Sequence, residues 1–419
     1  MTASLVRTTA PWLIAAMLLL ALPHLFGSNS AITIMNQMAI TIVFALSYNV
    51  LLGQAGMLSF GHAVYMGLGG YFAIYSMNWL SRNGVPIPLP FLPLFGGMFS
   101  LGIAMIIGSL QIRRSGVVFA MISLGIVELV ASYAIITYGF FNGGGIGGDR
   151  TYMVPFFGVA FLQQVEVYYV VMFWMLLSAL LMYLFSRTVM GRMANAVRDN
   201  PERVEFVGYS AYWVRFCSFC VAGFFAGVAG SLFAVTYEIV TVENMNLEAS
   251  GTILMVAFLG GVGYFFGPVL GAVVFTILQT VLSLHTDLWQ LYTGALFVAA
   301  VMFFPGGLAG VLALHALVLR RDSVFGLIGP YVFTVIPAMI CVMSVAGLCE
   351  ILSHSRNASV GESRMVLLWT EFDSHEPVAW IALTVAAIAG FWLARRQAPL
   401  LASVWTKAGA FSHQSGLPD

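Results

Sequence analysis

The side chains that could do chemistry in this sequence are few, and the most unusual lie inside apolar segments. Glu128 is the one carboxylate deep in such a segment, and His62, Asn49 and Ser59 place polar groups in another. A charge at the middle of a membrane costs at least about 2.5 kcal/mol. We therefore expect Glu128 either to face the protein interior, bonded to Ser132 or an adjacent helix, or to contact a solute. His62 is expected either to pack in the interior or to titrate in a pathway.

The sequence lacks the residue patterns of common catalytic centres. Its one lysine, Lys407, is not preceded by GxxxxGK[ST], so this chain has no phosphate loop with which to hydrolyse ATP alone. There is no nucleophile elbow and no HExxH. Cys217 and Cys220 could share a helix face, but no His, Asp or Glu follows at metal-ligand spacing. We expect a protein that is not an enzyme and binds no metal or cofactor of its own.

The polar residues near His62 sit in a glycine-rich stretch, Leu46–Tyr71, which reads LSYNVLLGQAGMLSFGHAVYMGLGGY. Glycine lets a neighbouring helix or a solute approach the backbone closely. Two interpretations follow. The glycines, Gly53, Gly56 and Gly61 among them, either serve tight helix packing or mark a broken helix that lines a translocation path.

A fainter version of this pattern occurs in the second half of the chain. Leu52–Gly56 reads LGQAG and is followed by FG, and Leu259–Gly263 reads LGGVG and is also followed by FG. Glycine interruptions at matching places in two halves of a transporter point to its binding site. Gly260 and Gly263 therefore join the candidate pathway residues.

The composition around these stretches is that of a polytopic membrane protein. Of the 419 residues, 60% are hydrophobic and 8% are charged, with a mean hydropathy of +0.93, whereas soluble domains have about 25% charged residues. Zero net charge without a basic run argues against a nucleic-acid partner. The first apolar run is interpreted as an uncleaved span, and the piece at 249–262 is short for a crossing. The apolar segments are 11–27, 31–52, 58–80, 90–112, 115–140, 167–186, 215–237, 249–262, 265–283, 288–312, 326–351 and 377–395.

The distribution of basic residues predicts the orientation. With the N-terminus in the cytoplasm, alternation places all Lys and Arg inside except Arg82, Arg150, Arg356 and Arg364. The positive-inside rule favours this arrangement, in which both termini are cytoplasmic.

The longest inner loop, Arg187–Arg215, is expected to form two short helices. Met193–Asp199 has a helix-forming composition, and Asp199 or Asn200 can cap a second helix that begins at Pro201. Gly208 would end it. Such an amphipathic element either lies on the membrane surface or docks onto a partner.

Three stretches carry a resemblance to a known family. Leu46–Tyr71, GTILMVAFLGGVGYFFGPVLGAVV and FFPGGLAGVL resemble the branched-chain amino acid permease subunits of bacterial ABC importers, whose relatives serve urea and, more distantly, simple sugars. The resemblance covers about residues 30–312. It implies a second permease subunit, homologous or identical, two cytoplasmic ATPase subunits that use ATP, and a periplasmic solute-binding protein. It further implies that the inner loop seats in the ATPase, with Arg198, Asp199, Glu202 and Gly208 as its coupling residues.

The chain departs from the family pattern after residue 312. We expect a permease domain over 1–312, an extension over 313–396 with two further spans, and a cytoplasmic tail over 397–419. The extension contains an outer loop at Ser353–Glu376, and the resemblance gives it no role.

The sequence therefore predicts an all-α, polytopic helical bundle, with about ten family-like segments and two extra spans. The resemblance implies that it lies in the bacterial inner membrane and that its solute is a branched-chain amino acid or a related small amino acid or amide. The alternatives are a urea or short-chain amide permease, a secondary transporter or channel acting alone, and a structural subunit without a pathway. The candidate pathway residues are Asn49, Gly53, Gly56, Ser59, Gly61, His62, Glu128, Gly260 and Gly263.

Overall fold

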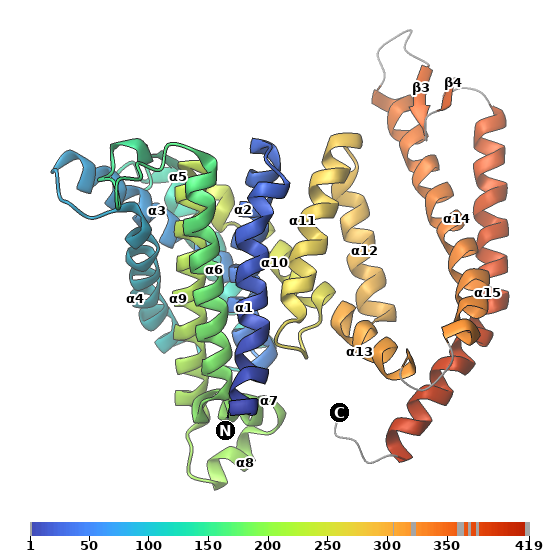
Figure 1. Cartoon of the computed structure of the whole chain (residues 1–419), viewed down its shortest axis with the longest axis horizontal. Helices are drawn as coiled ribbons and strands as arrows, with labels where there is room; N and C mark the ends of the chain where they lie inside the picture. The colour runs from blue at the N-terminus through green and yellow to red at the C-terminus, as the bar shows by residue number, and fades with distance from the viewer. Residues whose placement is uncertain are drawn as a thin grey trace. The chain divides into compact units, whose positions relative to one another are not determined.

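The computed structural model describes residues 2–304, 306–319, 324–357, 364–367, 370–373 and 377–414. This part of the chain is almost entirely helical, as the composition predicts (Figure 1). It divides into two compact units, one made of Met1–Thr280 with Phe297–Gly310 and the other of Val281–Leu296 with Val311–Asp419. The expected boundary at residue 312 falls close to this division, although residues 281–296 group with the C-terminal part.

The first unit holds most of the helices, together with a two-stranded antiparallel sheet in which β1 (Gly145–Gly147) pairs with β2 (Ile239–Thr241). Its helices are α1 Thr2–Leu25, α2 Asn29–Asn49, α3 His62–Arg82, α4 Leu92–Gln111, α5 Val117–Ile136, α6 Gln164–Arg187, α7 Val189–Asp199, α8 Pro201–Phe206, α9 Ala211–Tyr237, α10 Leu247–Gly260 and most of α11 Gly267–His285. The end of α12 (Trp289–Phe303) and the start of α13 (Gly307–Leu319) also belong to it.

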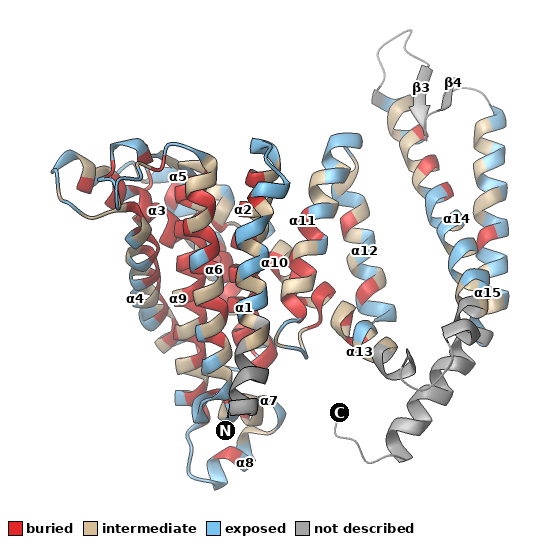
Figure 2. Ribbon diagram, in the orientation of Figure 1, coloured by how far each residue is buried: buried red, intermediate tan, exposed pale blue. Residues whose placement is uncertain are grey.

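Helix α9 is the centre of the first unit. It packs against α2, α3 and α4, and 83% of its most apolar window is buried. Figure 2 shows buried residues along its length. The approach of α3 is so close that a methyl group added at Gly230 would lie 1.8 Å from the carbonyl oxygen of Met66. Small residues thus bring the two backbones together, which is how membrane helices gain packing energy where no hydrophobic force drives them.

The second unit consists mainly of two long helices, α14 (Val324–Asn357) and α15 (Pro377–Gln414), which pack on each other. Part of the expected outer loop between them forms a hairpin in which β3 (Arg364–Leu367) pairs with β4 (Thr370–Asp373). Helix α15 continues past residue 396, where the sequence suggested the start of the tail.

The helices are consistent with several membrane crossings. Eight in the described part are long and apolar enough to span a membrane, or nine if the bent pair α12–α13 counts as one. Helix α10 has 14 residues, which agrees with the expectation that this segment is short for a crossing.

Candidate functional site

The glycine-rich stretch forms a break between α2 and α3. Helix α2 passes into a π-helical turn, Val50–Gln54, and the chain is then non-helical until His62. Gly56 takes φ +67°, a left-handed conformation that glycine adopts easily at a helix end. The amides of Gly56 and Met57 donate to the carbonyls of Leu52 and Leu51 at 3.1 and 3.0 Å. Gly56 therefore lies where the chain turns.

We call residues 55–61 the strap, because they double back along the last turns of α2. The Tyr48 hydroxyl donates to the Ser59 carbonyl at 3.1 Å, and the Ser47 hydroxyl lies 2.9 Å from Nε2 of His62. Ser59 also accepts a hydrogen bond from the amide of Gly61 through its hydroxyl. Non-helical backbone in a membrane protein needs such internal partners, because lipid offers none.

The strap is tied to α5, and the start of α3 that follows it is tied to α10. The Phe60 amide donates to the Ser123 hydroxyl of α5 at 2.9 Å, and the amide of Ala63, at the start of α3, donates to the Ser250 hydroxyl at 3.1 Å. A methyl group at Gly61 would lie 2.5 Å from the Ser123 carbonyl oxygen. The strap thus joins helices that are far apart in the sequence.

The two similar glycine-rich stretches, Leu52–Gly56 and Leu259–Gly263, lie close together in the structure. The Asn49 amide donates to the Tyr264 carbonyl at 3.4 Å, and a methyl group at Gly53 would lie 2.7 Å from the Val262 carbonyl oxygen. Gly260 ends α10 against the backbone of Gly267, whereas a methyl group at Gly263 would meet nothing within 4 Å. The structure therefore brings Asn49 and Gly53 to the α10–α11 turn.

His62 is enclosed rather than open to a channel within this chain. Its ring stacks on Phe44, with ring centroids 5.5 Å apart and planes 6° apart, and its side chain is buried. Asn49, Gln54 and His62 each keep one buried polar atom that lacks a protein partner among the described residues. These atoms are available to water or to a bound molecule.

Glu128 corrects an expectation, because its side chain does not face the interior of this chain. It is exposed on α5, as is Ser132, and it makes no hydrogen bond or ion pair to another described residue. Gly125 on the same face also meets nothing within 4 Å. A bare carboxylate within a span is too costly to leave in lipid, so this face requires water or another subunit beside it.

The inner loop forms the two expected short helices, α7 and α8. The amide of Arg203 donates to Oδ1 of Asn200, so Asn200 rather than Asp199 caps α8, which begins at Pro201. Gly208 follows its end with φ +92°. The buried face of α7, with Gly191, Ala194 and Val197, packs against α9, and Val189 and Met190 at its start stay exposed.

The C-terminal end of α8 forms an exposed apolar tip. Phe206 is 91% exposed, and Val207 and Glu202 are exposed beside it. Arg198, near the end of α7, donates from Nη1 to the carbonyl of Gly53. The loop and the strap, which the sequence suggested separately, are therefore in contact.

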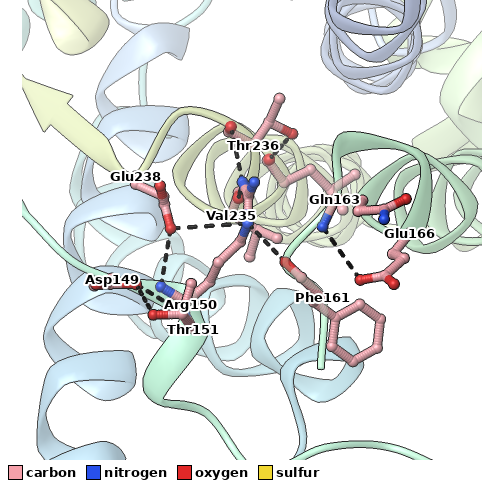
Figure 3. A network of polar contacts seen from close by, with 10 residues as sticks. Asp149, Arg150, Thr151, Phe161, Gln163, Glu166, Val235, Thr236 and Glu238 are labelled. Atoms are coloured by element: carbon pink, nitrogen blue, oxygen red, sulfur yellow. Dashed lines mark hydrogen bonds and ion pairs between the residues drawn. The ribbon is translucent and has the colours of Figure 1, made fainter. Parts of the chain in front are cut away.

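Arg150 is a structural residue that the sequence analysis missed (Figure 3). Only 5% exposed, it donates from Nε to the Phe161 carbonyl and from Nη1 to the Val235 and Thr236 carbonyls, at 3.0–3.2 Å. Its own amide donates to Glu238, which follows the end of α9. A guanidinium suits the unpaired carbonyls at a helix C-terminus. The adjacent Asp149 accepts two hydrogen bonds from Thr151, which hold the pKa of Asp149 below its usual value.

The second unit holds another missed carboxylate. Glu350 lies within the apolar stretch of α14, so Glu128 is not the one carboxylate inside a span. It accepts hydrogen bonds from the Thr286 hydroxyl and, at 2.8 Å, from the Tyr292 hydroxyl. Within the described residues no group of His, Cys, Asp and Glu could hold a metal ion.

Comparisons with known proteins show the family to which the sequence is similar. The model of a family described as branched-chain amino acid transport system / permease component matches residues 30–304. Over 305 residues the chain is 26% identical to the high-affinity branched-chain amino acid transport system permease protein LivM of Salmonella typhimurium, covering 67% of this chain and 70% of LivM. It is 24% identical over 287 residues to the permease protein LivH of Escherichia coli, covering 64% and 90%. Over 156 residues it is 31% identical to the autoinducer 2 import system permease protein LsrC of Klebsiella pneumoniae, covering 35% and 45%. No solved structure matches the chain.

Proposed function

The chain belongs to the family of branched-chain amino acid transport permeases, and we propose that it is the membrane-spanning subunit of an ATP-driven importer for branched-chain amino acids or a related small amino acid or amide. The observation that carries the proposal is the extent of the family match. Residues 30–304 contain the strap, the helices bonded to it, and the two short helices α7 and α8, which we call the α7–α8 hairpin. Because the family is that of a permease component, ATP hydrolysis belongs to a separate subunit.

The proposed solute rests on the relatives and on Glu128. LivM and LivH are named for branched-chain amino acids, and LsrC for autoinducer 2. An exposed carboxylate inside a span would pair well with the ammonium group of an amino acid, since opposite charges attract strongly where water is scarce. A second permease subunit beside α5 would enclose Glu128 in a shared path. Asn49, Gly53, Gly56, Ser59, Gly61, His62, Gly260 and Gly263 would form or support the inner part of that path.

The experiment that tests the proposal is uptake of radiolabelled leucine, valine and isoleucine into vesicles, with the neighbouring permease, ATPase and binding-protein genes co-expressed. Uptake should require ATP and should stop when the ATPase is inactivated. Glu128→Gln should raise KM for the amino acid in the same vesicles. Uptake that follows a proton gradient and ignores the ATPase would support a secondary transporter instead.

We also propose that both termini are cytoplasmic in the inner membrane. Cysteines introduced by Asn142→Cys and Ser359→Cys should react with an impermeant maleimide in spheroplasts, and one introduced by Glu202→Cys should not. Ser359 lies outside the described residues. Labelling of the Glu202→Cys chain from outside would reverse the orientation.

In this orientation the exposed tip of α8 faces the ATPase subunits. Arg198, Asp199, Glu202 and Gly208 lie on the hairpin that would meet them. Gly208 donates its amide to the Glu205 carbonyl at 2.9 Å and has φ +92°, so Gly208→Pro removes a donor and forces another backbone conformation. The variant should hydrolyse ATP with little uptake. Normal uptake with normal solute-stimulated hydrolysis would remove α8 from the coupling role.

A further inference from the structure

The contact between Arg198 and the strap is more specific than a surface ion pair. The guanidinium donates to the Gly53 carbonyl, which belongs to the last turn before the strap. Carbonyls at a helix end have no partner within the helix, and a cation there also interacts favourably with the helix dipole. Nε of Arg198 lies 3.1 Å from Oδ1 of Asp199, which orients the guanidinium from its other side.

The stem of Arg198 occupies the space that Gly56 leaves. A methyl group at Gly56 would lie 2.6 Å from Cγ and 3.2 Å from Cβ of Arg198. Gly56 is thus required twice, once for its positive φ and once for the passage of this side chain. The end of α2, the start of the strap and the end of α7 therefore pack closely against one another.

Helix α7 is suited to move as one piece with α8. Asn200 caps α8 directly after α7 ends, and Val204 of α8 is buried. The exposed tip at Phe206 and Val207 is where a cytoplasmic partner would press. Arg198 is the next-to-last residue of α7, beside its connection to α8. A tilt of α7 and α8 together therefore moves the guanidinium of Arg198.

The far end of the strap is bonded to α5, the helix that carries Glu128. The Phe60 amide donates to the Ser123 hydroxyl, and Ser123 is buried, whereas Glu128, five residues later, is exposed. Five residues are about one and a half helical turns, so the two side chains leave α5 on different faces. Hydrogen bonds and close packing therefore connect α7 and the strap with the buried face of α5.

We propose that Arg198 is the positioning residue through which a displacement of the α7–α8 hairpin reaches the strap and, through Phe60 and Ser123, α5. This inference rests on the proposed function, because the displacement comes from the ATPase subunits. The Arg198–Gly53 bond ties α7 to the turn that precedes the strap, and the stem of Arg198 packs on Gly56 of the strap.

The test measures how accessible the strap is to a thiol reagent, in addition to transport. Met57 is a buried strap residue, and Met57→Cys is introduced after Cys217, Cys220, Cys341 and Cys349 are replaced by alanine. The complete complex with its ATPase subunits is labelled with N-ethylmaleimide, once with ADP and once with ATP and vanadate. The labelling rate should depend on the nucleotide. In Arg198→Met it should rise about tenfold with ADP and lose that dependence, since a hydrogen bond from a charged group is gone.

Control variants separate this role from general stability. Arg198→Met keeps the apolar stem over Gly56, and Arg198→Lys should restore part of the nucleotide dependence because it retains a cationic donor. Arg113→Met removes an exposed inner arginine of the α4–α5 turn and should label like the parent. ATP hydrolysis should persist in Arg198→Met while the amount of solute moved per ATP falls.

The outcomes are distinct. If Arg198→Met keeps the nucleotide dependence, or the parent lacks it while importing solute, the role of Arg198 is wrong and the proposed function stands. A chain that never assembles with an ATPase would overturn both.

Discussion

The two units of the chain bury their residues in different ways. In the first unit 83% of the most apolar window of α9 is buried, whereas the corresponding windows of α14 and α15 in the second unit are 17% and 6% buried. In the first unit, hydrogen-bonded contacts such as those of the strap and Arg150 surround the central helix α9. In the second unit, the described parts of α14 and α15 expose apolar side chains along most of their length. The family match at residues 30–304 covers most of the first unit, includes residues 281–296 of the second, and ends before α14.

This contrast indicates that the matched unit carries a specified internal structure, and that the second unit is a simpler membrane element. Polar groups inside a membrane protein must find internal partners, so each one fixes the geometry of its neighbours. Exposed apolar side chains impose no such condition in lipid. Substitutions at comparable positions in the two units should therefore differ in effect.

The largest difference is expected for bulky replacements of glycine. Gly61→Leu would drive a side chain into the backbone of Ser123, which cannot move aside, so the amount of folded protein should fall sharply. Gly329→Leu in α14 meets nothing within 4 Å and should be tolerated. Fluorescence size-exclusion chromatography of the solubilised variants measures both. Uptake per folded complex then decides whether Gly61 also borders the path, since normal uptake per complex would leave it a packing role alone.

The surroundings of Gly61 show which features the sequence could predict and which it could not. Composition and the lengths of the apolar segments predicted the all-α membrane fold, the composition of Met193–Asp199 predicted α7, and the turn chemistry around Pro201 and Gly208 predicted α8, because these signals are local. The glycine pattern likewise located the break before α3. Contacts between distant segments, such as Phe60 with Ser123, leave no local signal and could not be predicted.

Side-chain direction was similarly beyond the sequence. Glu128 was expected to face the interior or to contact a solute because a charge in a span needs a partner, but that partner can also be another chain. Arg150 counted only as one of four basic residues expected outside, although an arginine in a glycine-rich loop can fold back onto a helix end. Glu350 was overlooked because it lies near the end of its apolar segment.

A smaller effect is expected from replacing buried and exposed arginines. Arg150→Met leaves three carbonyls without their side-chain donor and removes the ion pair with Glu238, which should lower stability by about 3 kcal/mol. Arg396→Met in α15 removes an exposed guanidinium that lies over Trp392, and should cost less than about 1 kcal/mol. Thermal unfolding in one detergent compares the two. Equal shifts would contradict the contrast between the units.

Glu350→Gln should have a still smaller and local effect. The amide oxygen can replace the carboxylate as acceptor for Thr286 and Tyr292, so only the charge assistance of these bonds is lost, about 1 kcal/mol. Glu350→Ala removes the acceptor and should expose the α14 end more. Limited proteolysis between α14 and α15 should be slightly faster in the first variant and clearly faster in the second. Equal rates in both variants and the parent would show that these hydrogen bonds do not hold α14.

The smallest effect on transport is expected from removing α14 and α15 altogether. A chain that ends after Leu319 retains every residue of the family match and every hydrogen bond of the strap, α7 and Arg150. Each helix satisfies its own backbone, so the shortened chain should insert, and uptake per assembled complex should stay near that of the full chain. The end of α11 and the start of α12 lose Glu350 and the packing of α14, so the loss should appear there, as faster proteolysis near Thr286. A shortened chain that reaches the membrane with its ATPase but moves no solute would break the contrast, because the mechanism would then need the second unit as well.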